Sequence, residues 1–341
     1  MGKRIIVDLP GTIIRVKEGV LTLARGAKLV KIRFDDLDEL RLGPGMMIST
    51  DVLIHAVNAK TMILIADSKG ELVGIFMPAT YTGTVKTQRE QIRAYDDARG
   101  LTLAKSFAKT SILTRAALLN YLASNRVGTP EEEILKNASL SIEEKALKID
   151  NIVGKLDEIR QQIMAIEANA AEIYFKTLQY VIPEKYCYMG KRTRRPPEDP
   201  FNAAISFVNN RIREIALQAV IAAGLHPYFG FLHADKPGRF SMALDLAEEF
   251  IVPVGHTVAI KLFVREIMKE TDFVKRGKAV FLSKEGRDKV LRELEEKLAK
   301  KIRFKGVNTT IRGAIYRQAR HLASYLKGET ENYVPAKIPL H

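Results

Sequence analysis

The hydrophobic pattern of the chain changes near residue 80. Before that point, short runs of β-branched and apolar residues alternate with turn signals such as Pro10-Gly11 and Glu18-Gly19, which is typical of strands. These runs are RIIVDL, TIIRVK, VLTLAR, KLVKIRF, ELRLG, TMILIA and ELVGIFM. The segment DVLIHAVNAK, preceded by capping residues that begin at Ser49, is expected to form one short helix. The first 80 residues therefore predict a small, mostly β domain.

After residue 80 the apolar residues recur at helical intervals. We expect long helical segments at 86–126, 141–182, 201–223, 241–270, 283–301 and 309–326, and a short helix starting in GTPEEE at 128–133. The interruption KRTRRPPEDP at 191–200 is too polar and proline-rich to pack, and the tail 327–341 is expected to be loose. The predicted fold class is α+β, with an N-terminal β domain at 1–80 and a larger, all-helical C-terminal domain at 81–341.

Composition narrows the class of protein. With 341 residues, 46% hydrophobic and 28% charged, the chain is expected to be globular, with one large or two ordinary domains. A single cysteine, Cys187, excludes an internal disulfide and a cysteine-based zinc site, and it fits a reducing cytoplasm. The start MGKRIIVDLP does not resemble a signal peptide, and the longest apolar runs are too short to cross a bilayer. We therefore expect a cytoplasmic protein.

Positive charge is concentrated in the second part of the chain. The formal net charge is +14; residues 1–80 contain 11 Lys and Arg against 9 Asp and Glu, which leaves +12 for residues 81–341. Such an excess favours a polyanionic partner such as DNA or RNA, although a thermophile-like surface explains it as well. The candidate phosphate contacts are Lys191, Arg192, Arg194, Arg195, Lys236 and Arg239. The alternative for the cluster at 191–195 is a solvated loop.

One carboxylate falls on an apolar helix face. In the segment around 152–178, Glu167 lies within the stripe formed by Ile152, Leu156, Ile159, Ile163, Ile166, Ala170, Tyr174 and Leu178. A carboxylate among core residues is costly unless a cation, a metal or strong donors neutralise it. Glu167 is therefore paired with a lysine or arginine, or lies at the solvent-exposed margin of the stripe, or is a metal ligand or acid–base group.

A histidine and several acids share the segment GFLHADKPGRFSMALDLAEEF at 230–250. His233 ends an apolar run, and it is either a hydrogen-bonded core residue or a ligand. Asp245 and Glu248 are three residues apart and project from one side of a predicted helix, and Glu249 is expected on roughly the same side. One imidazole with carboxylates from different helices is a plausible ligand set for Mg²⁺ or Mn²⁺.

Three stretches carry a resemblance to a known family. IEANAAEIYF at 166–175, RRPPEDPFNAAISF at 194–207 and AAGLHPYFGFLHADKPGRFSMALDLAEEF at 222–250 resemble the CRISPR-associated integrase of the adaptation module. The resemblance implies an N-terminal β domain, a C-terminal helical domain, and metal ligands at Glu167, His233 and Glu248, with Asp245 as a flanking acid. The sequence departs from the family pattern at Ala168, at His226 and after Phe250. None of these departures affects a predicted ligand.

The resemblance also implies an activity and partners. A 3′-hydroxyl of a short DNA duplex attacks a phosphodiester at the boundary of a CRISPR repeat, which inserts a new spacer and so serves antiviral defence. The same metal-dependent site can cleave DNA when water replaces the hydroxyl. The implied partners are double-stranded DNA (protospacer and repeat), a second copy of the chain and a small CRISPR-associated adaptation protein.

Two other functions stay open from the sequence. One is a metal-dependent nuclease whose task is hydrolysis in DNA repair. The other is a non-catalytic DNA-binding scaffold, for which the loss of Glu167 has no consequence.

Overall fold

Two compact units make up the chain, Met1–Thr82 and Gly83–His341. The computed structural model describes residues 3–59, 61–68, 70–76 and 84–340. The predicted domain boundary between residues 80 and 81 lies outside the described residues. Within the described part of the chain, no helix has the length and apolar character needed to cross a membrane.

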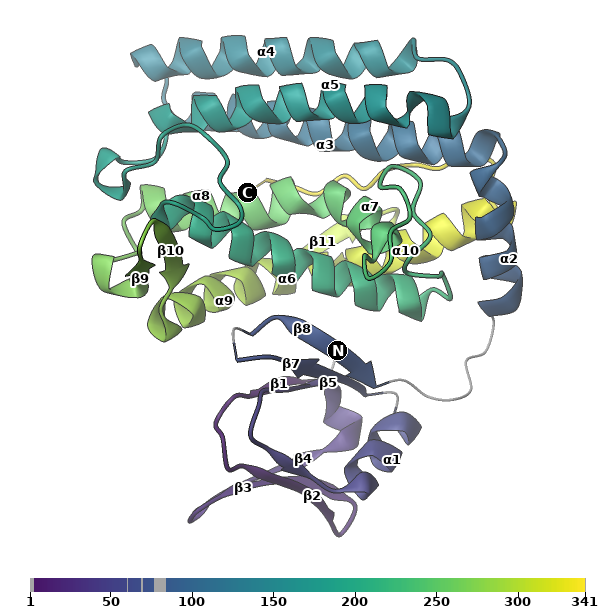
Figure 1. Cartoon of the computed structure of the whole chain (residues 1–341), viewed down its shortest axis with the longest axis vertical. Helices are drawn as coiled ribbons and strands as arrows, with labels where there is room; N and C mark the ends of the chain where they lie inside the picture. Colours follow the sequence, from purple (N-terminus) through teal and green to yellow (C-terminus); the bar gives the residue numbers. More distant parts are fainter. Residues whose placement is uncertain (1–2, 60, 69, 77–83, 341) are drawn as a thin grey trace. The chain divides into compact units, whose positions relative to one another are not determined.

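Two four-stranded sheets and one helix build the N-terminal unit (Figure 1). One sheet has the strand order β1-β5-β7-β8 and the other β4-β3-β2-β6. The elements are β1 (Lys3–Val7), β2 (Ile13–Lys17), β3 (Val20–Arg25), β4 (Lys28–Arg33), β5 (Leu37–Leu42), β6 (Met47–Ile48), α1 (Thr50–Asn58), β7 (Met62–Ala66) and β8 (Leu72–Phe76). The predicted turn at Glu18-Gly19 has positive φ at both residues (54° and 75°), as a tight hairpin requires. Ile14, Leu21 and Leu40 are completely buried in the core of this unit.

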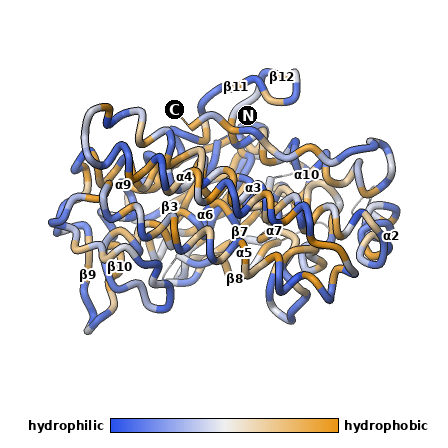
Figure 2. Tube along the Cα trace, turned by 90° about the horizontal axis from the view of Figure 1, so that it is seen from above, coloured by the Kyte–Doolittle hydropathy of each residue, from blue (hydrophilic) through white to orange (hydrophobic). Residues whose placement is uncertain are grey.

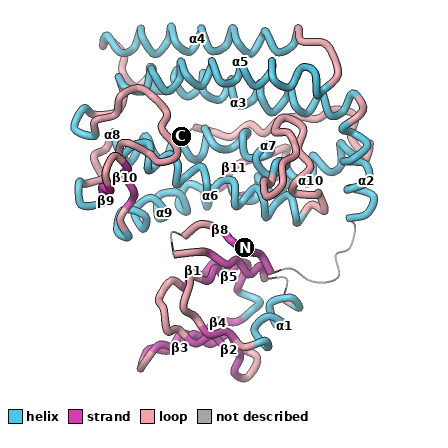
Figure 3. The backbone as a smooth tube through the Cα atoms, in the orientation of Figure 1, coloured by secondary structure: helices cyan, strands magenta, loops and turns pink. Residues whose placement is uncertain are grey.

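Helices dominate the second unit (Figure 3). They are α2 (Thr84–Tyr95), α3 (Ala98–Ser124), α4 (Pro130–Asp150), α5 (Leu156–Thr177), α6 (Pro200–Ala222), α7 (Ser241–Phe250), α8 (Thr257–Val264), α9 (Lys284–Ala299) and α10 (Ile311–Leu326). Hydrophobic and hydrophilic positions alternate along α9, as expected of an amphipathic helix (Figure 2). The predicted α+β class, with a β part followed by a mostly helical part, is confirmed.

Several helix boundaries differ from the prediction, including those of the expected short helix at 128–133, which is the 21-residue α4. The expected helix at 141–182 is wrong, because the chain leaves helical geometry between α4 and α5, where Gly154 has φ of +140°. The segment 86–126 is likewise broken, because the side chain of Asp97 accepts a hydrogen bond from the Arg99 amide and caps α3.

Two short hairpins interrupt the helical unit without having been predicted. They consist of β9 (Phe273–Arg276) with β10 (Ala279–Leu282), and of β11 (Lys301–Phe304) with β12 (Val307–Thr310). Each turns at a glycine with positive φ, Gly277 and Gly306. Four-residue strands carry too little alternation to be separated from the helical patterns around them.

Helix α7 lies in the interior of the second unit. It packs against α3 and α6, and nearly every one of its residues is buried. The chain continues from α7 into a buried π-helical segment, Ile251–His256, which contains Pro253. A proline within a helix removes a backbone donor and favours such a local widening.

The C-terminal tail is ordered, and the expectation of a loose tail is wrong for residues 329–340. The side-chain amide of Gln318 donates hydrogen bonds to the Tyr333 hydroxyl and to the carbonyl of Val334, both at 3.0 Å. The Lys297 ammonium donates to the Leu340 carbonyl at 3.1 Å, and Tyr333 is buried. These contacts compensate for the absence of regular secondary structure.

Candidate functional site

Three helices and one loop contribute side chains to the candidate site. Ser111 and Arg115 lie on α3, Glu167 on α5 and Glu248 on α7, and His233 belongs to the loop that precedes α7. Helices α3, α5 and α7 pack together in the second unit because α3 contacts both of the others. This packing brings together the two acids that the sequence predicted as ligands.

The hydroxyl of Ser111 connects the two acids. Its Oγ lies 2.7 Å from Oε2 of Glu248 and 3.2 Å from Oε1 of Glu167. A hydroxyl has one proton to donate, so these carboxylates are alternative acceptors of the same hydrogen bond. Ser111 is completely buried.

A buried guanidinium supplies the positive charge of the site. Nη2 of Arg115 lies 2.8 Å from Oε1 of Glu167, and Nη1 donates to Oγ of Ser111 at 2.5 Å. The side chain of Arg115 is 7% exposed and that of Glu167 is 24% exposed. Of the alternatives for Glu167, the salt bridge is present in the structure, and its side chain is also partly exposed.

The imidazole of His233 is fixed by Asp245. Nδ1 of His233 lies 2.7 Å from Oδ1 of Asp245, whose carboxylate also accepts hydrogen bonds from the backbone amides of Phe231, Leu232 and His233. Asp245 is completely buried and takes part in the site through the histidine. When Nδ1 donates to Asp245, the lone pair of the neutral ring is on Nε2, as a metal-binding histidine requires.

The pKa values of the site show how its charges interact. Burial alone would lower the pKa of His233, but the hydrogen bond to Asp245 and the carboxylates of Glu248 and Glu167 raise it. Burial alone would raise the pKa of Glu248, but the charges of Arg115 and His233 lower it. Glu167, His233 and Glu248 therefore lie within electrostatic reach of one another.

A closed metal shell is not formed. Among the described residues, no group of three or more His, Cys, Asp and Glu side chains is arranged to hold a metal ion. The chemistry of the donors nevertheless fits a divalent ion, since two carboxylates and an imidazole suit Mn²⁺ or Mg²⁺. The buried carboxylate of Asp245 behind His233 is the second-shell partner that such a ligand needs.

Glu249 has different hydrogen-bond partners from Asp245, although both acids lie near Tyr333 of the tail. Its carboxylate accepts hydrogen bonds from the Tyr333 hydroxyl and from the Ala336 amide of the tail, at 2.7 Å for the latter. Because α7 is buried on all sides, its neighbouring acids face different elements. Glu249 therefore belongs to the tail contact.

The predicted phosphate contacts fall into two groups. Arg192 and Arg239 are turned toward the protein: Arg192 contacts the side chains of Asn202 and Ser206, and Arg239 contacts Ser241 and the carbonyl of Ala234. Burial, with the nearby charge of Arg194, lowers the pKa of Arg192 to about 10. The exposed members of the set are Lys191, Arg194, Arg195 and Lys236.

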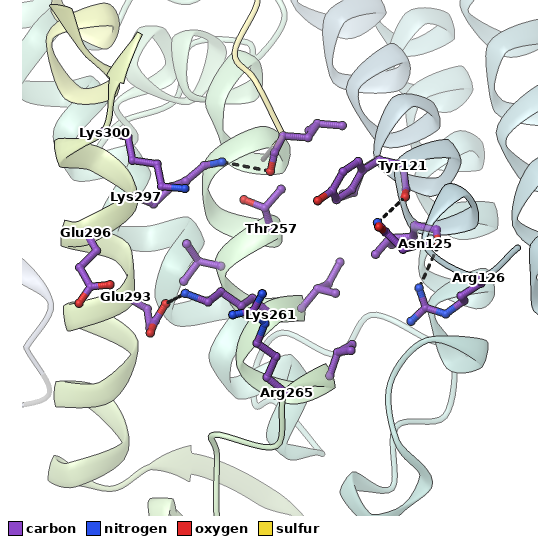
Figure 4. Close-up of a pocket in the computed structure, with 16 residues that line it drawn as sticks. Tyr121, Asn125, Arg126, Thr257, Lys261, Arg265, Glu293, Glu296, Lys297 and Lys300 are labelled. Carbon is purple, nitrogen blue, oxygen red and sulfur yellow. Dashed lines mark hydrogen bonds and ion pairs between the residues drawn. The ribbon is translucent and has the colours of Figure 1, made fainter.

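A cavity of about 520 Å³ shares no lining residue with the candidate site (Figure 4). Its walls come from α3, α8 and α9, with Leu340 of the tail. In Figure 4, Lys261 points toward Glu293, with which it forms an ion pair, and Lys297 is bonded to the Leu340 carbonyl. The chemistry predicted from the sequence thus lies outside this cavity.

Ser111 and Arg115 were missed by the sequence analysis. They are four residues apart and continue the buried stripe that contains Phe107, so the helical period places both on the interior face of α3. Polar residues on a buried stripe were the signal for Glu167, and the same signal was present here. Arg213 and His256, which are also buried near Glu248 and Arg115, had no comparable signal.

Comparison with solved structures first shows which proteins share the fold of this chain. The chain is similar to a casposase bound to integration product, with a TM-score of 0.82, 21% sequence identity, and coverage of 99% of this chain and 93% of that one. It is also similar to a Cas6-RT-Cas1–Cas2 complex, with a TM-score of 0.79 and 19% identity, covering 98% of this chain and 36% of that one.

Sequence comparison then gives the family. The family model described as CRISPR associated protein Cas1 matches residues 5–296. The CRISPR-associated endonuclease Cas1 1 of Archaeoglobus fulgidus is 32% identical over 335 residues, which cover 96% of this chain and 97% of the relative. The chain belongs to the Cas1 family, and the resemblance seen in the sequence is confirmed.

Proposed function

We propose that the chain is an integrase and endonuclease of CRISPR adaptation, which joins the 3′-hydroxyl ends of short DNA duplexes to a repeat array and can also cleave DNA. One observation supports the proposal: Ser111 lies within hydrogen-bond distance of both Glu167 and Glu248, and the charges of these two acids raise the pKa of His233. Membership of the Cas1 family and the similarity to a casposase bound to integration product support it.

Glu167, His233 and Glu248 are the proposed ligands of a divalent ion, Mg²⁺ or Mn²⁺. When bound, such an ion lowers the pKa of an attacking hydroxyl and neutralises charge that develops on the phosphoryl group. Asp245 holds the imidazole of His233 in one orientation, with Nε2 available as a donor. Glu167 is the more exposed of the two acids and is therefore the one better able to meet DNA.

The proposed reaction exchanges one phosphodiester for another. The oxygen of the 3′-hydroxyl forms a bond to a phosphorus atom of the repeat as the bond from that phosphorus to the neighbouring 3′ oxygen breaks. The proton of the attacking hydroxyl is lost and the leaving oxygen gains one. Since the number of phosphodiesters does not change, no nucleotide triphosphate is required, and water in place of the hydroxyl gives cleavage.

Exposed basic residues are proposed to bind the DNA backbone. Lys191, Arg194, Arg195 and Lys236 are exposed and are proposed to reach phosphates, with Lys191 exchanging its ion pair with Glu198, whereas Arg192 and Arg239 are proposed to support the loops that carry them. The proposed assembly is a homodimer joined by a small CRISPR-associated partner, which the similarity to a Cas6-RT-Cas1–Cas2 complex supports. We further propose that the protein acts in the cytoplasm.

A joining assay tests this function. Purified protein is incubated, with and without Mn²⁺, with short duplexes carrying 3′-hydroxyl ends and a supercoiled plasmid carrying a repeat. We expect joined products only with the metal, and a loss of at least about 100-fold in His233→Ala and Glu167→Gln, because each variant removes a ligand. DNA binding measured on the same samples should stay within a few-fold of wild type.

The alternatives give different results in the same assay. A repair nuclease would cleave the plasmid without joining, and a non-catalytic scaffold would make the variants indistinguishable from wild type. Lys301→Gln, an exposed change on β11, serves as the control for handling and folding.

A further inference from the structure

The two proposed ligand acids share one guanidinium. Arg115 pairs directly with Oε1 of Glu167, and it reaches Glu248 through Ser111, whose Oγ is 2.7 Å from Oε2 of that acid. The oxygen of Glu167 that Arg115 contacts is also the one closest to Ser111. A positive charge thus already lies where the carboxylates converge.

Burial makes this charge necessary when no metal is bound. Arg115 and Glu248 are buried and Glu167 is partly buried, and two neighbouring acids in such surroundings repel each other unless a cation compensates them. Among the described residues, the polar partners of Arg115 are Ser111 and Glu167, and its Nε has none. The guanidinium is therefore held by Glu167 and by the Ser111 hydroxyl, which in turn lies against Glu248.

We propose that Arg115 is the counter-cation of Glu167 and Glu248 in the metal-free protein and competes with a divalent ion for Glu167. This inference rests on the proposed function, in which Glu167 and Glu248 are ligands. A metal ion replaces the guanidinium as the compensating charge, so binding requires the contact between Arg115 and Glu167 to break. Arg115 consequently stabilises the metal-free protein and lowers its affinity for metal.

Arg115→Met tests the competition, since methionine fills similar space without charge. Mn²⁺ binding to the chelator-treated full-length protein is measured by calorimetry, and thermal unfolding is recorded without metal. We expect the dissociation constant for Mn²⁺ to fall roughly tenfold, within the usual range of coupling between two sites, and the unfolding temperature without metal to fall as well. Arg115→Lys, which keeps the charge, should bind Mn²⁺ nearly as wild type does.

Arg312→Met is the matched control. Arg312 is as buried as Arg115 and pairs with one carboxylate, Glu295, at 2.6 Å on α9. Its loss should lower the unfolding temperature and leave the Mn²⁺ dissociation constant unchanged.

The possible outcomes distinguish a failure of the proposed competition from a failure of the proposed function on which it rests. Unchanged or weaker Mn²⁺ binding in Arg115→Met, with binding abolished by His233→Ala, overturns the competition and leaves the metal site standing. Binding that survives in His233→Ala overturns both. Should Arg115→Met fail to fold, guanidinium NMR of the wild-type protein, assigned with Arg115→Lys, gives the answer: a shifted Arg115 signal on Mg²⁺ addition supports displacement, and an unmoved one contradicts it.

Discussion

At the scale of single residues, most buried polar side chains of this protein have hydrogen-bond partners, and the side chains that lack one are informative. Asp245 illustrates the rule, since its two oxygens accept from three backbone amides and from His233. His256 is an exception. Its Nδ1 lies 3.1 Å from the Tyr174 hydroxyl, but its Nε2 is buried without a partner among the described residues.

His256 is expected to make stability depend on pH. Burial, followed by the charges of Arg115, Arg192 and Arg213, lowers its pKa well below the ordinary 6.5. His256 is therefore protonated below about pH 6.5 in the unfolded chain but stays neutral in the folded protein. The free energy of unfolding consequently decreases as the pH falls below that value. Between pH 6.5 and 5 the loss amounts to roughly 2 kcal/mol.

Urea unfolding of wild type and His256→Gln over this range measures the effect. Glutamine can still accept a hydrogen bond from Tyr174 but does not titrate. We expect the difference in free energy of unfolding between the two proteins to shrink as the pH falls. A difference that stays constant from pH 7.5 to 5 would show that the ring is protonated in the folded state.

At the scale of elements, the regular periodic segments were predicted correctly and the irregular ones were not. The strand runs of the first unit and the helices α6, α9 and α10 follow from alternation and helical periodicity. The break between α4 and α5 was missed because it depends on Gly154, whose left-handed backbone leaves no trace in the apolar pattern. The short hairpins were too brief to show alternation.

Long-range contacts were the other limit of prediction. The sequence identified Glu167, His233 and Glu248 as candidate ligands, but it could not reveal that Ser111 and Arg115 of α3 lie among them. It also placed Glu249 roughly beside Asp245, but it could not reveal that the partners of Glu249 are Tyr333 and Ala336 of the tail. Spacing along one helix predicts only the relative directions of its side chains. The elements packed around the helix determine which residues each side chain contacts.

The tail is expected to stabilise α7. Ending the chain after Gly328 removes Tyr333 and Ala336, which donate hydrogen bonds to the buried Glu249, and exposes the surface that the tail covers. The hydrogen bonds and the apolar burial of the tail are lost together, and we expect a loss of about 4 kcal/mol, or roughly 10 °C in the unfolding temperature.

Differential scanning calorimetry of the truncated protein and of Tyr333→Phe checks this contribution. The single variant keeps the ring and loses one hydroxyl, so its unfolding temperature should lie between those of the truncated and wild-type proteins. If truncation leaves the transition where it was, the tail only covers α7 and does not stabilise it.

At the scale of the whole molecule, the charge distribution matches the proposed role. Residues 81–341 carry a net charge of +12, and the exposed cluster at 191–195 lies on the same unit as the candidate site. Nonspecific DNA binding releases about one counterion for each phosphate that is neutralised, so the slope of log affinity against log salt counts the contacts. That slope distinguishes a DNA surface from a merely basic one.

The double variant Arg194→Gln, Arg195→Gln tests whether this cluster belongs to the DNA surface. Both side chains are exposed, and if each neutralises one phosphate the slope should become shallower by about 2, with weaker binding at every duplex sequence. Fluorescence anisotropy of a labelled duplex between about 50 and 200 mM salt measures the slope.

The double variant Lys301→Gln, Arg303→Gln removes the same charge from β11 and is the control. An equal change of slope in both variants would mean that DNA responds to total charge, and an unchanged slope in both would remove the 191–195 cluster from the binding surface.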